Sequence, residues 1–110
     1  MAPIDQLPAI QAFCAGAQLI DERGGKCVFL PDLGIMAGDT EMSQDALFVP
    51  NNLLGYGSSR LLYSAQLSSG SGQNWTQHHL VGRTWWAPSF KVPQQPAWRD
   101  EILAHLKGVA

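Results

Sequence analysis

The sequence has two cysteines among its 110 residues, Cys14 and Cys27, and both lie in the first quarter of the chain. The later segment that carries most of the tryptophans has no thiol at all. A thiol nucleophile would therefore have to come from the N-terminal quarter. In a reducing compartment we expect the two cysteines to be buried free thiols rather than a disulfide.

Charge is also scarce. Charged residues make up 15% of the chain, against about 25% in typical soluble proteins. The formal net charge is −2, and the seven Lys and Arg residues are scattered. A protein that neutralises phosphates needs such residues clustered, so we expect no nucleic-acid partner. The sparse charge leaves a polar, aromatic and glycine-rich surface of the kind that meets another protein.

Long apolar runs are missing as well. No run approaches the roughly 20 residues that a membrane-spanning helix needs. The N-terminus, MAPIDQLPAI, lacks a basic head followed by a long apolar stretch, so it does not predict a signal peptide. These absences favour a cytoplasmic protein without a membrane partner. The length predicts a single domain, residues 1–110, with one sizeable core.

The periodicity predicts an α+β domain with a short amphipathic helix at each end. Near the N-terminus, Ile10 and Cys14 fall at helical spacing, and Pro8 is placed in the first turn. Near the C-terminus, Trp98 and Ile102 begin an apolar stripe that repeats every four residues.

Between the helices the pattern predicts a four-stranded antiparallel meander followed by an irregular, aromatic-rich segment, 74–91. The predicted strands are 18–22, 26–30, 46–49 and 60–67. Pro31 and Pro50 are expected to end the second and third strands, because proline cannot donate to a ladder. Residues 32–45 and the small-residue run 68–72 are predicted to be loops.

Few residues are candidates for catalysis. His78 and His79 are adjacent, so in a strand they would point to opposite faces and chelate a metal poorly. One of them could act as a general base in a cleft lined by tryptophans. Cys27 is the weaker alternative, since core packing is the ordinary role of both thiols. No ligand spacing predicts a metal site, and we expect no cofactor.

The aromatic residues are the candidates for partner binding. Trp85 and Trp86 are consecutive, and tandem tryptophans in a loop cannot both point inward easily. One of them is therefore predicted to be an exposed anchor, with Trp75 and Tyr56 as further partner-binding residues. Core packing is the alternative for the tryptophans.

Three segments together carry a family resemblance. Residues 47–63 contain a strand, a turn with Pro50 and Tyr56, and a second strand; residues 74–79 follow, and then the tryptophan-bearing run 85–89. With a helix at each end, this order resembles the ubiquitin-conjugating (UBC) superfamily, in particular its divergent bacterial branches found beside ubiquitin-like modifiers. Residues 74–79 fall where that family places its active-site flap.

The chain departs from the family at the residues that carry its chemistry. Members that hold a modifier as a thioester have a cysteine after the fourth strand, and this chain has none after Cys27. The His-Pro-Asn signature of the flap is absent too. The resemblance therefore implies a non-catalytic, cysteine-less form. Such a form would bind or position a ubiquitin-like modifier, or its activating or conjugating partner, in a bacterial system.

Three other functions stay open. The first is a small enzyme with His78 or His79 as general base. The second is an interaction protein of unrelated α+β fold, such as an antitoxin-like or viral assembly component. The third is a conjugating enzyme that uses Cys27 from an unexpected position. An exposed apolar patch near Tyr56 and Trp85 would favour the binding module, and a concave site holding a histidine would favour the enzyme.

Overall fold

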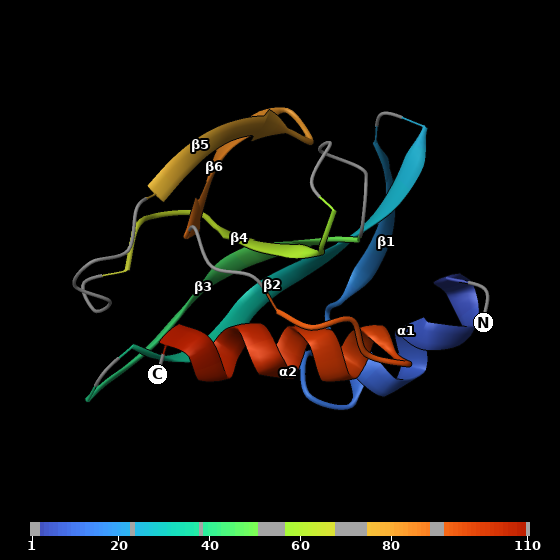
Figure 1. The fold of residues 1–110 in the computed structure, drawn as a ribbon, viewed down its shortest axis with the longest axis horizontal. Coiled ribbons are helices and arrows are strands. Elements are labelled where there is room, and N and C mark those ends of the chain that lie inside the picture. The colour runs from blue at the N-terminus through green and yellow to red at the C-terminus, as the bar shows by residue number, and fades with distance from the viewer. Residues whose placement is uncertain are drawn as a thin grey trace.

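A computed structural model describes the chain at residues 3–22, 24–37, 39–50, 57–67, 75–88 and 92–109. Within these ranges it has two helices and one six-stranded antiparallel sheet (Figure 1). The elements in chain order are α1 (Pro3–Gln11), β1 (Gln18–Glu22), β2 (Gly25–Ala37), β3 (Thr40–Val49), β4 (Arg60–Tyr63), β5 (Trp75–Leu80), β6 (Arg83–Pro88) and α2 (Trp98–Val109). The α+β class and both terminal helices are confirmed, whereas the predicted number of strands is wrong.

The strands lie in the order β1-β2-β3-β4-β6-β5, and every neighbouring pair is antiparallel. The first four strands therefore form the predicted meander. The β5–β6 hairpin is added beyond β4, where Tyr63 pairs with Trp86. This order leaves β1 and β5 at the two edges of the sheet. No helix among the described residues has the length and apolar character needed to cross a bilayer.

The predicted loop 32–45 is instead the outer half of the β2–β3 hairpin. Strand β2 continues through Pro31, where we expected it to end. The register between β2 and β3 shifts between Leu30 and Leu33, and such an irregularity lets a proline sit in a strand without breaking the ladder on either side.

The predicted irregular segment also contains a hairpin, β5–β6. Its two-residue turn is formed by Val81 and Gly82, with φ angles of 51° and 71°. Two consecutive positive φ angles match the twist of the flanking strands, although a β-branched residue seldom adopts this conformation.

Three smaller differences concern boundaries. The fourth strand ends at Tyr63 rather than at residue 67. Pro8 lies inside α1, because the helix begins at Pro3. The expected anchor Tyr56 and the predicted loop 68–72 lie outside the described residues.

The sheet is apolar on both faces, and the residues that the structure describes form two cores. In β4, Leu61 and Tyr63 pack on the face that carries α1 and α2, while Leu62 packs on the opposite face. The second core, which we call the inner core, consists of Cys27, Leu47, Val49, Leu62, Leu80, Trp85 and Ala87. Both helices lie on one side of the sheet, and the β5–β6 hairpin arches over the other side (Figure 1).

The inner core is covered by the curl of the sheet itself. The ring of Phe29 in β2 meets the ring of Trp85 in β6 edge-on, with 6.2 Å between the ring centroids, although β3 and β4 separate these strands in the sheet. At one corner, Glu22 Oε1 accepts a hydrogen bond from the Val81 backbone N–H at 3.1 Å. This bond links the end of edge strand β1 to the β5–β6 turn.

Replacement of Glu22 tests this corner contact. We expect Glu22→Ala to lower the free energy of unfolding by about 1–2 kcal/mol, because a partly buried hydrogen bond to a carboxylate is lost. Urea denaturation followed by tryptophan fluorescence measures the change. Asp21→Ala is the matched control, since Asp21 is an exposed carboxylate paired with Lys26 at the surface and should change stability by less than about 0.5 kcal/mol. Equal losses in the two variants would contradict the closing role of Glu22.

Candidate functional site

A hollow of about 260 Å³ lies where the start of α2 meets α1 and the end of β3. Gln6 of α1 and Pro50, which follows β3, form two of its walls. The remaining walls come from residues 94–96 and from Trp98 and Glu101 of α2. Carboxylate, amide and indole side chains thus converge on one concave surface.

The walls of the hollow are held by contacts within the fold. Gln6 Oε1 accepts a hydrogen bond from the Trp98 backbone N–H at 2.7 Å, which satisfies a helix-start donor that has no partner inside α2. The indole of Trp98 packs against the ring of Phe48 in β3, with 5.8 Å between the centroids. The first turn of α2 is therefore attached both to α1 and to the sheet.

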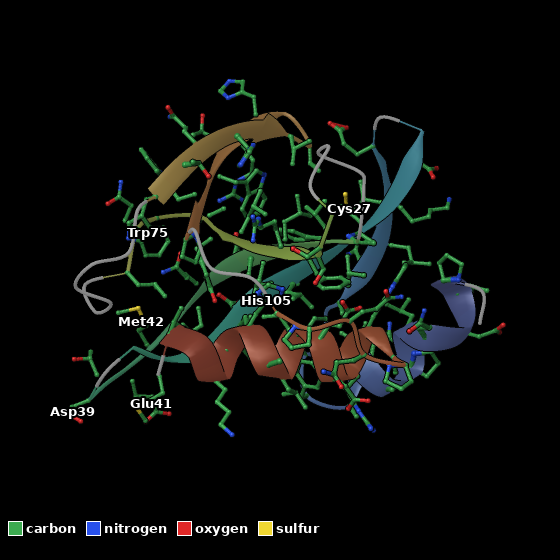
Figure 2. The ribbon with its side chains drawn as sticks, in the orientation of Figure 1. Cys27, Asp39, Glu41, Met42, Trp75 and His105 are labelled. Atoms are coloured by element: carbon green, nitrogen blue, oxygen red, sulfur yellow. The ribbon has the colours of Figure 1, made fainter. Side chains whose placement is uncertain are left out.

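A chain of buried polar side chains lies behind the hollow. Glu101 and His105 are one helical turn apart, so they share the face of α2 that meets the sheet; Figure 2 shows His105 between α2 and the strands. Ser59, immediately before β4, has its Oγ 3.0 Å from His105 Nε2 and also hydrogen-bonds the Glu101 carboxylate. The other carboxylate oxygen, Oε1, has no hydrogen-bond partner among the described residues.

Burial controls the protonation of these buried polar side chains. It lowers the pKa of His105 to about 4, the positive charge of Arg60 acts in the same direction, and a backbone hydrogen bond with Ser59 opposes both. The imidazole is therefore neutral near pH 7. Burial also raises the pKa of Glu101, against the hydrogen bond from Ser59. Because Ser59 has one hydroxyl proton, donating it to Glu101 leaves its oxygen to accept the Nε2–H of His105.

Serine, histidine and glutamate are also the residue types of a hydrolytic triad. Here, however, Ser59 is completely buried and His105 nearly so. A nucleophile must meet the substrate, and Ser59 lines neither this hollow nor the one between α1 and α2. The chain of hydrogen bonds therefore attaches α2 to the sheet.

The adjacent histidines lie away from the hollow, on edge strand β5. His78 pairs with Trp85 and His79 with Thr84 on β6, so the two imidazoles are on opposite faces of the hairpin. His78 Nε2 lies 3.3 Å from Thr76 Oγ1, and His79 Nδ1 lies 3.0 Å from the hydroxyl of Thr84. The structure does not bring either histidine to the hollow that Trp98 lines.

Both cysteines are buried thiols rather than disulfide partners, as expected. Cys27 lies in the inner core and is completely buried, on the opposite side of the sheet from α2 (Figure 2). Cys14 Sγ donates to the Pro31 carbonyl at 3.4 Å. Burial and the negative charge of Asp32 raise the pKa of its thiol. Neither thiol is presented at the surface as a nucleophile.

The expectation of an exposed anchor is wrong at Trp85. Its side chain is completely buried, its Nε1–H donates to the Leu80 carbonyl at 3.0 Å, and the Arg83 guanidinium lies 4.4 Å from the centre of its ring. Trp86 and Trp75 are half-buried. Strand alternation, rather than a loop, separates the tandem tryptophans onto two faces. Among the residues that the structure describes, no group of three His, Cys, Asp or Glu side chains could hold a metal ion.

Sequence reasoning missed Glu101, Gln6 and the buried role of His105. A signal was present in the closing helix: Glu101 and His105 recur at the spacing of the apolar stripe that begins at Trp98. Polar residues on a buried stripe need partners, and here Ser59 is one of them.

No family model matches this chain, and neither a curated protein nor a solved structure matches it. The resemblance to the UBC superfamily rests on the three sequence segments alone.

His105 predicts a pH effect on stability. Its pKa in the fold lies below the ordinary value of 6.5, so its contribution is fully present above pH 6.5 and is lost as the pH falls toward 4. We expect the wild type to lose up to roughly 3 kcal/mol through this group. His105→Gln cannot take up the proton and should lose less. Urea denaturation at several pH values compares the two, with His79→Gln as the matched control. Parallel curves for wild type and His105→Gln would rule out this effect.

Proposed function

We propose that the chain is a non-catalytic, UBC-like protein-binding module. It binds or positions a ubiquitin-like modifier, or the activating or conjugating partner of one, in a bacterial modification system. The observation that carries the proposal is the exposed apolar surface of the helix layer. Ile4 of α1 is 63% exposed and Leu103 of α2 is 44% exposed. Because α1 and α2 contact each other, these two side chains offer a partner apolar contacts on neighbouring helices.

The helix layer also carries a groove, between the two helices. This second hollow has a volume of about 200 Å³. It is lined by Asp5, Gln6, Ala9, Ala97 and Arg99. Gln6 also lines the first hollow, so the two are adjacent. Leu103 follows Arg99 by one helical turn and extends the groove along α2. We call Ile4, the groove and Leu103 together the helix surface.

The charges around the helix surface indicate the kind of partner. Arg99 and Lys107 stand one turn before and one turn after Leu103, so they share its outward face. An apolar centre with a charged rim is the usual anatomy of a protein interface. Arg99 is paired with Asp100, so this rim favours a partner that presents a carboxylate beside Lys107.

The buried thiols support a positioning role. Cys14 and Cys27 are the chain's two cysteines, and both lie in cores. A module that holds a donor or an acceptor contributes proximity without supplying a nucleophile. An interaction protein of unrelated α+β fold would use the same surface, and the identity of the partner separates these two functions.

Affinity capture tests the proposal. We expect the tagged chain to recover a ubiquitin-like modifier or its activating or conjugating enzyme from its source cells, identified by mass spectrometry. Leu103→Asp should reduce that recovery at least about tenfold, because a charge is placed in the apolar centre of the interface.

The matched control is Met36→Asp, the same change at an apolar residue of β2 that is 47% exposed. It should keep the wild-type recovery. If the wild type recovers no protein of this class, or if Leu103→Asp recovers it undiminished, the proposal is wrong.

A further inference from the structure

The unpartnered oxygen of Glu101 is the starting point. The Glu101 side chain is only 5% exposed. Ser59 hydrogen-bonds its carboxylate, and Oε1 has no partner among the described residues. A buried carboxylate oxygen without a donor is costly, because it has lost its hydration and received nothing in exchange. A ligand that donates a hydrogen bond to this oxygen would remove that cost.

The surroundings of this carboxylate define the donor. Glu101 is part of the wall of the 260 Å³ hollow. Trp98, one turn earlier on α2, contributes an indole to the same wall, and aromatic rings attract cations. Gln95 also lines the hollow; its Nε2 donates to the Pro93 carbonyl at 3.3 Å, so its side-chain oxygen can serve as an acceptor. The polar groups of the hollow are thus suited to a ligand that carries a positive charge and donates hydrogen bonds.

We propose that this hollow binds an alkylammonium group. An ammonium has three donors and no acceptor, which matches Glu101 Oε1 together with the amide oxygen and the indole face. A guanidinium fits less well, because its fork needs two parallel acceptors and one oxygen of this carboxylate is already bonded by Ser59. The rings of Pro50 and Pro96 offer an apolar wall for the carbon chain.

The size of the hollow agrees with a lysine side chain. At about 30 Å³ for a water-sized group, the heavy atoms of a lysine beyond Cα occupy about 150 Å³. The hollow, at about 260 Å³, accommodates them. Resting on the proposed function, we assign the ammonium to a lysine of the bound protein, whose attachment to the neighbouring helix surface would direct that side chain into the hollow.

The electrostatics of the site support this assignment. Burial raises the pKa of Glu101, and the one contact that opposes burial is the hydrogen bond from Ser59. The positive charge of Arg60 acts instead on His105. A bound ammonium would supply the charge that stabilises the ionised carboxylate.

An NMR titration of the ¹⁵N-labelled full chain with Nα-acetyl-lysine N-methylamide tests the proposal. We expect saturable shifts of the Trp98 indole N–H and the Gln6 side-chain amide at millimolar ligand. The norleucine analogue, which lacks the ammonium, should cause none. Glu101→Gln keeps the shape of the side chain and its bond to Ser59, and should weaken binding at least about tenfold. Asp100→Asn, a change at the neighbouring carboxylate paired with Arg99, should keep the wild-type affinity.

A second arm distinguishes the source of the ammonium. Titration with n-butylammonium asks whether a free amine suffices. Binding of n-butylammonium without binding of the lysine amide would contradict the assignment to a protein lysine. Absence of saturable shifts with both probes, or equal affinity of wild type and Glu101→Gln, would overturn the site.

Failure of the site is distinguishable from failure of the proposed function. Leu103 does not line the hollow, so Leu103→Asp should leave the titration unchanged. Specific partner capture that depends on Leu103, combined with no ammonium binding, would remove the site and keep the binding module. Ammonium binding without capture of the expected partner would keep the site and remove the proposed binding function.

Discussion

The structure depends on a sheet whose middle strands are apolar on both faces. All four side chains of β4 and the last four of β3 are buried. The helices α1 and α2 cover one face, and the other face has no helix to cover it among the described residues. The sheet therefore curls until Phe29 meets Trp85 across its concave side, and Glu22 holds the rim to the β5–β6 turn. A flat sheet would expose the whole inner core to water.

The curl and the helix layer together position the candidate site. Ser59 stands immediately before β4, and its hydroxyl meets Glu101 and His105 of α2. Gln6 joins the start of the same helix to α1. The hollow lies where these attachments converge, so they fix the positions of its α1 and α2 walls. Glu101 is the costly member of this arrangement, because burial opposes its charge and one oxygen lacks a donor. Local costs of this kind concentrate at functional sites, where a ligand offsets them.

The parts of the fold that the sequence predicted are those with local signals. Apolar stripes indicated both helices, and paired glycines indicated the β1–β2 hairpin. The predicted end of the second strand at Pro31 was wrong, because the register shift that accommodates this proline depends on pairing with β3. The β5–β6 hairpin was missed because Val81 is an unusual residue at positive φ. The burial of Trp85, which depends on that hairpin, was therefore missed as well. Glu101 was missed because its partner Ser59 is distant in sequence.

The most direct test of the account is the proximity of Phe29 and Trp85 in solution. In the sheet, two strands, β3 and β4, lie between the strands that carry these rings, and the curl brings the ring centroids to 6.2 Å. We predict nuclear Overhauser effects between the ring protons of the two residues, together with slow exchange of the Trp85 indole N–H, which is buried and bonded to the Leu80 carbonyl. Absence of those effects, with rapid exchange of that proton, would contradict the curled sheet and the two-core architecture that depends on it.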